Sequence, residues 1–281
     1  MMNKKRKLIA VILLAGFVSL FLYLNNHWLQ TTTYRIYSER IPQPFDGLTI
    51  VQLSDLHDAT FGEKQTRLVE KVKKAQPDVI FITGDIIDSN RYDLENSLDL
   101  VKGLVKITDV YYVTGNHEVA VNEVEEIDEA LRELGVHVLT NKAKTFSRDG
   151  EQLVIAGVED PLMTGLNSPA KAVAASLDEA FKGLTGHPYS ILLSHRPEVF
   201  DVYVEKEMDL VLAGHAHGGQ IRIPFIGGLI APGQGWFPKY TAGRHERGIT
   251  TMVVNRGLGN SLIPFRIFNR PEVVVVKLKS G

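Results

Sequence analysis

The hydrophobic pattern of the chain begins with one long apolar segment. Residues 8–24 carry no charge and consist mostly of Leu, Ile, Val, Ala and Phe. A helix of this length rises roughly 26 Å, which is just enough to cross the hydrocarbon core of a bilayer. The segment has no polar face, so a helix buried in a soluble core is disfavoured. We therefore predict a transmembrane helix over residues 8–24, preceded by a basic segment over residues 1–7.

After residue 47, short apolar runs alternate with amphipathic segments, and this alternation predicts a layered α/β fold. Residues 25–47 form a linker with an expected edge strand at 31–41, which ends before Pro42 and Pro44. We expect two packed mixed β-sheets flanked by helices, an α-β-β-α sandwich, in one domain over 48–281. The expected strands are 48–53, 79–83, 110–113, 136–139, a hairpin over 144–158, 189–193, 210–213, 220–223, 250–254 and 272–278. The expected helices are 67–75, 94–105, 123–134, 169–182 and 198–207, and a long loop is expected over 227–243.

Charge and composition narrow the function. The formal net charge of the 281 residues is −2 and no basic stripe is visible, which disfavours a nuclease and nucleic acid as a partner. The chain has no cysteine, which excludes disulfides, thiolate nucleophiles and Cys-based zinc sites. His, Asp, Glu and Asn remain as possible metal ligands.

The charges around the apolar segment predict its orientation. Four basic residues at positions 4–7 precede it, and no small-x-small cleavage site follows it. Trp28 lies where the interfacial aromatic belt of a membrane helix is expected. We therefore favour an uncleaved signal anchor in the cell membrane over a removed signal peptide. The positive-inside rule then places the N-terminus in the cytoplasm and the catalytic domain outside it.

Polar side chains follow the apolar strands in five blocks. The blocks contain five of the nine histidines of the chain. Each block alone is weak evidence, since Gly-Asp and Gly-Asn are common in turns. Strands of such sheets present ligands at their carboxyl ends, so we expect the blocks to meet at one metal site. The blocks are Asp55 with His57, Asp85, Asn116 with His117, His195, and His215 with His217.

The order Asp-x-His, Gly-Asp, Gly-Asn-His-Glu, a single His and Gly-His-x-His resembles the calcineurin-like metallophosphoesterase superfamily over roughly residues 48–278. Within it, the chain looks most like bacterial membrane-associated phosphodiesterases, which include the transmembrane type of UDP-diacylglucosamine hydrolase. This closer similarity rests on the segments 217–220 and 233–240.

The resemblance implies a dinuclear site. One ion would be held by Asp55, His57 and His217, and the other by Asn116, His195 and His215. Asp85 would bridge both ions, and His117 would be the catalytic histidine. A role for His117 in orienting a ligand is the alternative.

General chemistry agrees with these roles. Two divalent cations sharing a carboxylate can provide a bound hydroxide near neutral pH, which would attack phosphorus in line. A protonated His117 would give its proton to the leaving alkoxide. Nitrogen and oxygen ligands suit Mn²⁺, Zn²⁺, Fe²⁺ or Co²⁺, and the resemblance favours Mn²⁺.

Three further residues are candidates for substrate binding. Arg256 could contact a phosphate, although packing or a turn role is the simpler interpretation. Trp236 and Phe237 could form a rim for lipid chains, or they could pack onto their own domain.

The predicted activity is hydrolysis of a phosphodiester or pyrophosphate bond, with a lipid-linked phosphorylated substrate as one candidate. A cell-wall or nucleotide phosphodiesterase is an alternative. A non-catalytic metal-binding scaffold is another, although it would have no chemical need for both Asp85 and His117.

Overall fold

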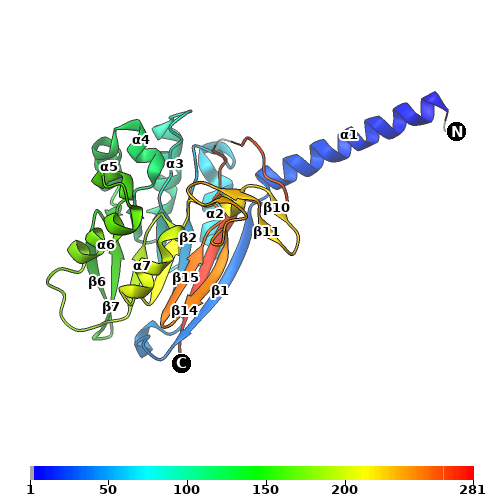
Figure 1. Ribbon diagram of the computed structural model, residues 1–281. Coiled ribbons are helices and arrows are strands. Elements are labelled where there is room, and N and C mark those ends of the chain that lie inside the picture. The colour runs from blue at the N-terminus through cyan, green and yellow to red at the C-terminus, as the bar shows by residue number, and fades with distance from the viewer. Residues whose placement is uncertain (1–2, 262) are drawn as a thin grey trace.

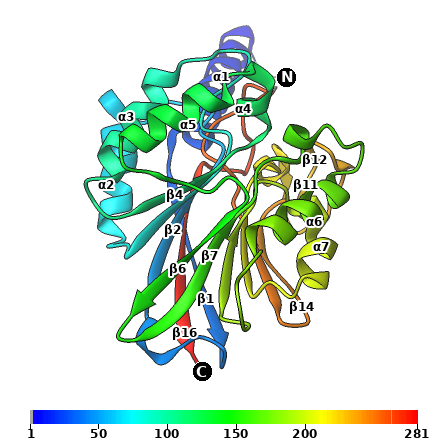
Figure 2. The same ribbon diagram turned by 90° about the vertical axis from the view of Figure 1, so that its left-hand side faces the viewer.

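The computed structural model describes residues 3–261 and 263–281, and it shows four layers in the order helix, sheet, sheet, helix (Figures 1 and 2). Residues 1 and 2 of the predicted basic segment lie outside the described residues. Both sheets combine parallel and antiparallel pairs. The predicted α/β class with two packed mixed sheets is confirmed.

The first sheet has six strands in the order β1-β16-β2-β3-β4-β5. Its strands β2, β3, β4 and β5 are mutually parallel, β16 runs antiparallel to β2, and β1 is the edge strand that the sequence predicts. The strands are β1 (Gln30–Ser38), β2 (Thr49–Leu53), β3 (Val79–Thr83), β4 (Val110–Val113), β5 (His137–Val138) and β16 (Glu272–Ser280).

The second sheet has six strands in the order β14-β15-β9-β8-β7-β6. Its strands β15, β9, β8 and β7 are mutually parallel, and β14 and β6 close its two edges in antiparallel pairs. The strands are β6 (Lys142–Arg148), β7 (Glu151–Gly157), β8 (Ser190–Leu193), β9 (Leu210–Ala213), β14 (Gly243–Arg247) and β15 (Thr250–Val254).

Three apolar clusters hold the layers together. The central cluster packs one sheet on the other, for example through Ile50 and Leu212. Val51, the neighbour of Ile50, belongs instead to the cluster between the first sheet and its helices, because successive strand side chains point to opposite faces. That outer cluster involves α2 (Thr66–Lys74), α3 (Leu94–Leu104) and α5 (Val124–Glu133). On the other side, α6 (Pro169–Ala180) and α7 (Phe200–Glu205) cover the second sheet.

Helix α1 (Lys4–His27) projects from the body, as Figure 1 shows. It is the helix, among the described residues, that is long and apolar enough to cross a membrane, and its most apolar 18 residues have a mean hydropathy of 2.4 and are almost all outside the folded body. Its last turns rest on the body, where Phe21 packs edge-on against Phe268 and Asn26 accepts a hydrogen bond from Asn260 Nδ2 at 2.8 Å.

Some elements differ from the sequence prediction. Helix α4 (Asn116–Val121) and strand β14 were not predicted. The expected loop 227–243 contains the two-residue strands β11 (Gly227–Gly228), β12 (Ile230–Ala231) and β13 (Gly235–Trp236), and β10 (Arg222–Ile223) is shorter than expected. Short 3-10 turns are η1 (Gln43–Phe45), η2 (Glu63–Gln65), η3 (Pro161–Thr164), η4 (Pro197–Val199) and η5 (His217–Gly219).

Candidate metal centre

The five polar blocks meet where the parallel strands of both sheets end. The first three blocks follow β2, β3 and β4 in the first sheet, and the last two follow β8 and β9 in the second. Because the strands within each set are parallel, their carboxyl ends lie at the same edge of the sheet. The packing of the two sheets then places the two sets of side chains opposite each other.

One cluster of ligand atoms comprises Asp55, His57, Asp85 and His217, all buried. The Nε2 atoms of His57 and His217 lie 3.0 Å apart. His57 Nε2 is 3.6 Å from Asp85 Oδ2, and His217 Nε2 is 3.4 Å from Asp55 Oδ1. Two nitrogens and two carboxylates therefore converge on one point.

A second cluster comprises Asp85, His195 and His215, with Asn116 beside it. The Nε2 atom of His195 lies 3.1 Å from Asp85 Oδ2, 3.1 Å from His215 Nδ1 and 3.2 Å from Asn116 Oδ1. The other ring nitrogen, His195 Nδ1, donates to the Thr83 carbonyl at 2.8 Å. Since Nδ1 carries that proton, Nε2 is the nitrogen left to bind a cation when the ring is neutral.

Asp85 is the carboxylate that both clusters share. Burial by itself raises the pKa of Asp85, but the imidazole of His195 and its hydrogen bond hold that pKa well below its usual range. Conversely, burial lowers the pKa of His195, but the carboxylates of Asp85 and Asp55 outweigh this effect and raise it to about 10. Without cations, a protonated His195 therefore supplies part of the positive charge that this carboxylate needs.

The donor atoms fit two divalent cations. Ligands about 2.1 Å from one ion lie roughly 3.0 to 3.4 Å from each other, which is close to the separations of 3.0 to 3.6 Å given above. Burial and then the charge of Arg266 lower the pKa of His217 to about 3, so its ring is neutral and can coordinate. Asp55, His57, Asp85, His215 and His217 all have positive φ angles between 47° and 64°. Such strained backbone concentrates at functional sites, where it aims side chains.

Two glycines allow the loops of the site to approach closely. A Cβ at Gly115 would lie 2.3 Å from Asp85 Oδ1, and a Cβ at Gly214 would lie 1.9 Å from Ser54 Oγ. Real Cβ atoms do not reach these distances, so only glycine fits these two positions of the Gly-Asn-His and Gly-His-x-His blocks.

Glu118 fastens two of the loops that carry the ligands. Its Oε2 accepts from the backbone N–H groups of Gly115 at 2.7 Å and Asp85 at 3.0 Å, and its Oε1 accepts from that of Ile86 at 2.7 Å. Burial and then the charge of Asp85 raise the pKa of Glu118 to about 8. The sequence places Glu118 next to the ligands, but only the structure shows this role.

Arg196 and Asp160 form a support for His215 that the sequence analysis missed. The guanidinium of Arg196 binds both carboxylate oxygens of Asp160, at 2.6 and 3.0 Å, and its Nη1 lies 2.9 Å from His215 Nε2. Arginine can only donate, so in this structure His215 Nε2 accepts this bond and the proton of the neutral ring is on Nδ1, which faces the cluster. Nδ1 must lose that proton before it can bind a cation. The adjacency of His195 and Arg196 was the available signal.

His117 lies beside the first cluster, with its ring edge-on to that of His57 at 4.4 Å between centroids. Its Nδ1 accepts from the backbone N–H of Ser89 at 3.0 Å, and Ser261 Oγ lies 3.3 Å from its Nε2. A backbone N–H can only donate, so the proton of the neutral ring is on Nε2. His57, Asp88 and His117 also form a compact group.

The three candidate substrate contacts are placed differently. Arg256 Nη2 donates to Glu272 Oε1 at 2.9 Å, which favours the packing role over a phosphate contact. Trp236 and Phe237 are exposed, and Trp236 lies in β13, the partner of β12. Ile230 and Ala231 of β12 line an apolar hollow of about 180 Å³ that reaches His217.

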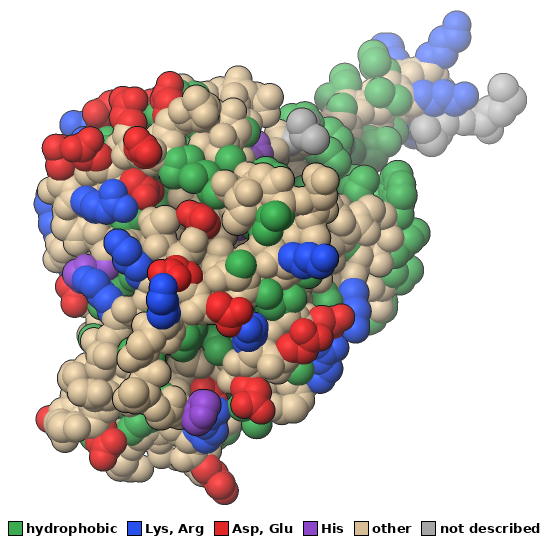
Figure 3. All heavy atoms as spheres, turned by 60° about the vertical axis from the view of Figure 1, so that its left-hand side comes forward, with side chains coloured by type: hydrophobic (Ala, Val, Ile, Leu, Met, Phe, Trp, Pro, Cys, Tyr) green, Lys and Arg blue, Asp and Glu red, His purple; other side chains and the backbone are tan. Residues whose placement is uncertain are grey.

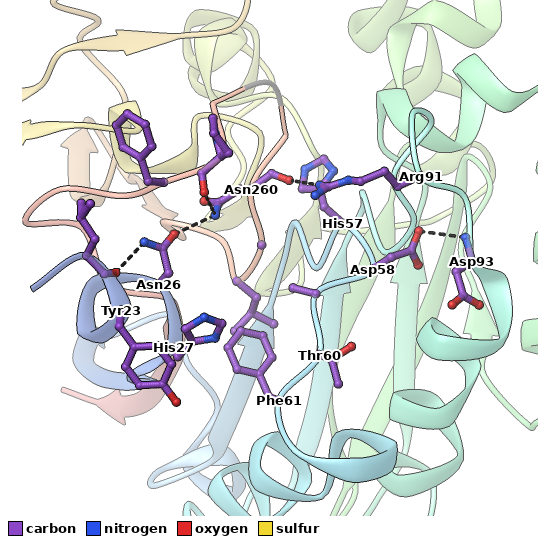
Figure 4. A pocket seen from close by; sticks show the side chains of 16 residues that line it. Tyr23, Asn26, His27, His57, Asp58, Thr60, Phe61, Arg91, Asp93 and Asn260 are labelled. Carbon is purple, nitrogen blue, oxygen red and sulfur yellow. Dashed lines mark hydrogen bonds between the residues drawn. The ribbon is translucent and has the colours of Figure 1, made fainter. Parts of the chain in front are cut away.

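A larger cavity of about 490 Å³ connects the first cluster with helix α1 (Figure 4). His57 lines it on one side, and Tyr23 and Asn26 of α1 line it on the other. Arg91 donates to the Asn260 carbonyl at 2.7 Å across this cavity. The last turns of α1 therefore line the same cavity as His57, a candidate metal ligand.

Comparisons with known proteins agree with this geometry. Residues 48–219 match the family model described as calcineurin-like phosphoesterase. The chain is 34% identical to the uncharacterized metallophosphoesterase YkuE of Bacillus subtilis, over 92% of this chain and 88% of that protein. It is 32% identical to a transmembrane protein with metallophosphoesterase domain of Danio rerio, over 86% of this chain and 56% of that protein. It is 28% identical to the phosphodiesterase YaeI of Escherichia coli, over 91% of this chain and 90% of that protein.

Proposed function

Because the chain belongs to the calcineurin-like phosphoesterase family, we propose that it is a membrane-anchored enzyme that hydrolyses a phosphodiester or pyrophosphate bond. It is a metal-dependent phosphoester hydrolase with a buried binuclear His/Asp site. The observation that carries the proposal is the position of Asp85, whose carboxylate belongs to both clusters of ligand atoms.

The ligand assignment is part of the proposal. Asp55, His57 and His217 would hold one cation, Asn116, His195 and His215 the other, and Asp85 would hold both. When bound, two divalent cations activate a water for attack on phosphorus and offset the charge on the phosphoryl oxygens. The nitrogen and oxygen donor set suits Mn²⁺, Fe²⁺, Co²⁺ or Zn²⁺, and family resemblance favours Mn²⁺.

His117 is the proposed catalytic residue. The Ser89 backbone N–H fixes its tautomer, so Nε2 holds the proton. Among the residues that the structure describes, Nε2 has one weak partner, Ser261 Oγ at 3.3 Å, which a leaving oxygen can replace. To act as the acid, the ring must first take up a second proton at Nδ1, which lies 3.1 Å from Ser89 Oγ and 3.7 Å from Asp88 Oδ1. The imidazolium would then transfer its Nε2 proton to that oxygen, which prevents the release of a basic alkoxide, and the ring would become neutral.

A lipid-linked substrate is supported by the position of the cavity in Figure 4. Leu22 and Tyr23, near the end of the apolar helix α1, share that cavity with His57. A substrate whose phosphate lies at the metal centre would then direct its apolar portion toward α1. Trp236 and Phe237 would extend this apolar environment on the side of His217. A cell-wall or nucleotide diester is the second candidate, and it needs no contact with α1.

Membrane topology forms a further part of the proposal. The basic residues that precede the apolar run of α1 favour a cytoplasmic N-terminus and an extracytoplasmic catalytic domain. Because the chain has no cysteine, Ser280→Cys provides a single reporter on the catalytic domain. Labelling of Ser280→Cys by an impermeant maleimide in intact cells is expected. Protection in intact cells with labelling after lysis would contradict this orientation.

The test of the activity uses the full chain in detergent, stripped of metal and then given Mn²⁺, Zn²⁺, Fe²⁺ or Mg²⁺. Metal-dependent hydrolysis of a chromogenic phosphodiester is expected, with loss of turnover in Asp85→Ala. Asp109→Ala, which removes an exposed carboxylate just before β4, should retain activity. A folded, metal-loaded protein without turnover on any phosphoester would favour the non-catalytic scaffold instead.

A further inference from the structure

Large apolar side chains lie exposed on the body next to α1. Phe225 and Ile226 form the tip of the β10–β11 hairpin, and Phe225 is fully exposed there with a φ of +68°. Phe268, which is also exposed, lines the same hollow of about 520 Å³ as the hairpin tip. Figure 3 shows hydrophobic side chains on the body beneath the projecting helix. We call Phe225, Ile226 and Phe268 the hairpin surface. Its side chains contribute little to the folded core.

The hairpin surface is firmly attached to α1. Arg222, at the start of the hairpin, donates its backbone N–H to the Ile267 carbonyl at 2.9 Å. Phe268, which follows Ile267 in the chain, packs edge-on against Phe21 of α1, with 5.1 Å between the ring centroids. The backbone hydrogen bond and the aromatic contact therefore hold the hairpin beside α1.

The contact with Phe21 fixes the height of this surface relative to a bilayer. Phe21 lies within the uncharged apolar run and six residues before His27, the last residue of α1. Six residues correspond to about 9 Å along a helix axis. With the apolar run in the hydrocarbon, Phe268 therefore lies near the hydrocarbon boundary, below the level at which α1 ends. The part of the body that contacts Phe21 cannot remain in bulk water.

The positions of Trp28 and Arg270 agree with the placement of Phe268 near the hydrocarbon boundary. Trp28 follows α1 directly, and the guanidinium of Arg270 lies 4.6 Å from the centre of its ring. An exposed Trp stacked with a cation is typical of the headgroup region, where an apolar ring and a charge are both accommodated.

We propose that the hairpin surface inserts into the same leaflet from which α1 emerges, so that its partner is the lipid bilayer. The inference rests on the membrane anchoring in the proposed function. Its consequence concerns the substrate, because the cavity between α1 and His57 then opens at the level of the lipid headgroups. The substrate class that reaches the metal site without leaving the bilayer is an amphiphilic phosphodiester, such as a phospholipid.

The test uses depth-dependent fluorescence quenching, which requires no activity. The full chain is reconstituted into vesicles of phosphatidylcholine and phosphatidylglycerol that contain lipids with a nitroxide on the acyl chain. Because the chain has no cysteine, single variants can carry one fluorophore each. Phe225→Cys reports on the hairpin surface and Leu14→Cys on α1. Gln152→Cys, exposed at the start of β7, reports on the opposite end of the second sheet.

If the hairpin surface inserts, the fluorophores at positions 14 and 225 should lose emission intensity and shift their emission to shorter wavelengths. The fluorophore at position 152 should show neither effect. Quenching at position 14 without quenching at position 225 would contradict insertion of the hairpin surface, and it would still support membrane anchoring by α1. Absence of quenching at both 14 and 225 would contradict the anchoring itself, and with it this inference.

A matched pair of variants tests the consequence for the substrate. Ile226→Asp changes the hairpin tip, where Ile226 is 66% exposed. Ile249→Asp changes the β14–β15 turn at the opposite end of the second sheet, where Ile249 is 51% exposed. Ile226→Asp should reduce hydrolysis of a phospholipid in vesicles about tenfold, because a buried charge opposes insertion, and leave a soluble diester unaffected. Ile249→Asp should change neither activity. Equal phospholipid activity in the two variants would overturn the proposed route.

Discussion

His57 Nε2 and His217 Nε2 lie 3.0 Å apart in the buried interior of the protein, although the two residues are 160 positions apart in the chain. Burial lowers the pKa of both imidazoles, and the repulsion between the two rings lowers that of His57 further, as the charge of Arg266 does for His217. Two neutral nitrogens aimed at a point shared with carboxylates are the arrangement that a cation completes.

This relationship predicts the effect of His217→Asn on metal content. The variant should retain the second cluster and lose the ion of the first, so that bound metal falls from two ions per chain to about one. Metal would be measured by mass spectrometry after gel filtration in metal-free buffer. His187→Asn, which changes an exposed histidine outside the site, should keep the full content. Equal metal content in both variants would contradict the assignment of His217.

Metal affinity should depend steeply on pH. In the metal-free protein the pKa of His195 is raised to about 10, because Asp85 and Asp55 outweigh the effect of burial. Below that pH a proton competes with the metal for His195 Nε2, so affinity should rise about tenfold per pH unit between pH 7 and 9 for one released proton.

Titration calorimetry in two buffers of different ionisation enthalpy measures this proton release directly. His195→Asn should bind metal more weakly and release about one proton fewer than the wild type. A pH-independent affinity between pH 7 and 9 would contradict the protonated state of His195.

Glu118→Gln should destabilise the protein. The substitution replaces one carboxyl oxygen by an amide NH₂. This NH₂ faces either the backbone N–H donors of Gly115 and Asp85 or that of Ile86. Loss of these buried bonds should cost about 2 kcal/mol, a fall in melting temperature of roughly 4 to 8 °C for a domain of this size. Thermal unfolding measures this shift, and Glu125→Gln, which changes an exposed residue of α5, should leave the melting temperature unchanged. An unchanged melting temperature in Glu118→Gln would show that these bonds contribute no stability.

The order of elements was largely predictable because the central strands are buried on both faces. Strands such as β3 and β9 consist almost entirely of apolar residues, which marks them in the sequence. The predicted ligands follow these strands directly, so the sequence also indicated which side chains would meet. Helix α4 escaped prediction because only six residues form it, and its cap depends on the distant loop that Glu118 binds.

The surroundings of the site were not predictable, since they depend on contacts between distant segments. Asp160 supports Arg196 from 36 positions away, and Asn26 is joined to Asn260 across 234 positions. Neither pair has a local pattern that would indicate it. The cavity between α1 and the metal site likewise exists only once the segment after β15 has folded back onto α1.

His117→Asn should show a loss that depends on the leaving group. The variant lacks the proton held on Nε2, so diesters with basic alkoxide leaving groups should react about 10² to 10⁴ times more slowly. A diester that releases a nitrophenolate needs little protonation and should lose far less. Comparison of kcat for the two substrates separates proton donation from damage to the metal site, and metal content serves as the control. An equal loss on both substrates would favour the role of His117 in orienting a ligand.

Trp236→Ala combined with Phe237→Ala distinguishes a lipid rim from local packing. Both side chains are exposed. Trp236 lies in β13, which pairs with β12, and β12 lines the apolar hollow that reaches His217. Removing two large apolar surfaces that contact only lipid should lower kcat/KM about tenfold or more for a phospholipid in vesicles, because each ring contributes on the order of 1 kcal/mol or more when buried. The same variant should hydrolyse a soluble diester at the wild-type rate. Tyr37→Ala provides the control, since Tyr37 on the edge strand β1 is 66% exposed, nearly as much as Trp236 at 68%. Equal losses on the lipid and the soluble diester would show that the two aromatic residues support the fold of the loop rather than contact the substrate.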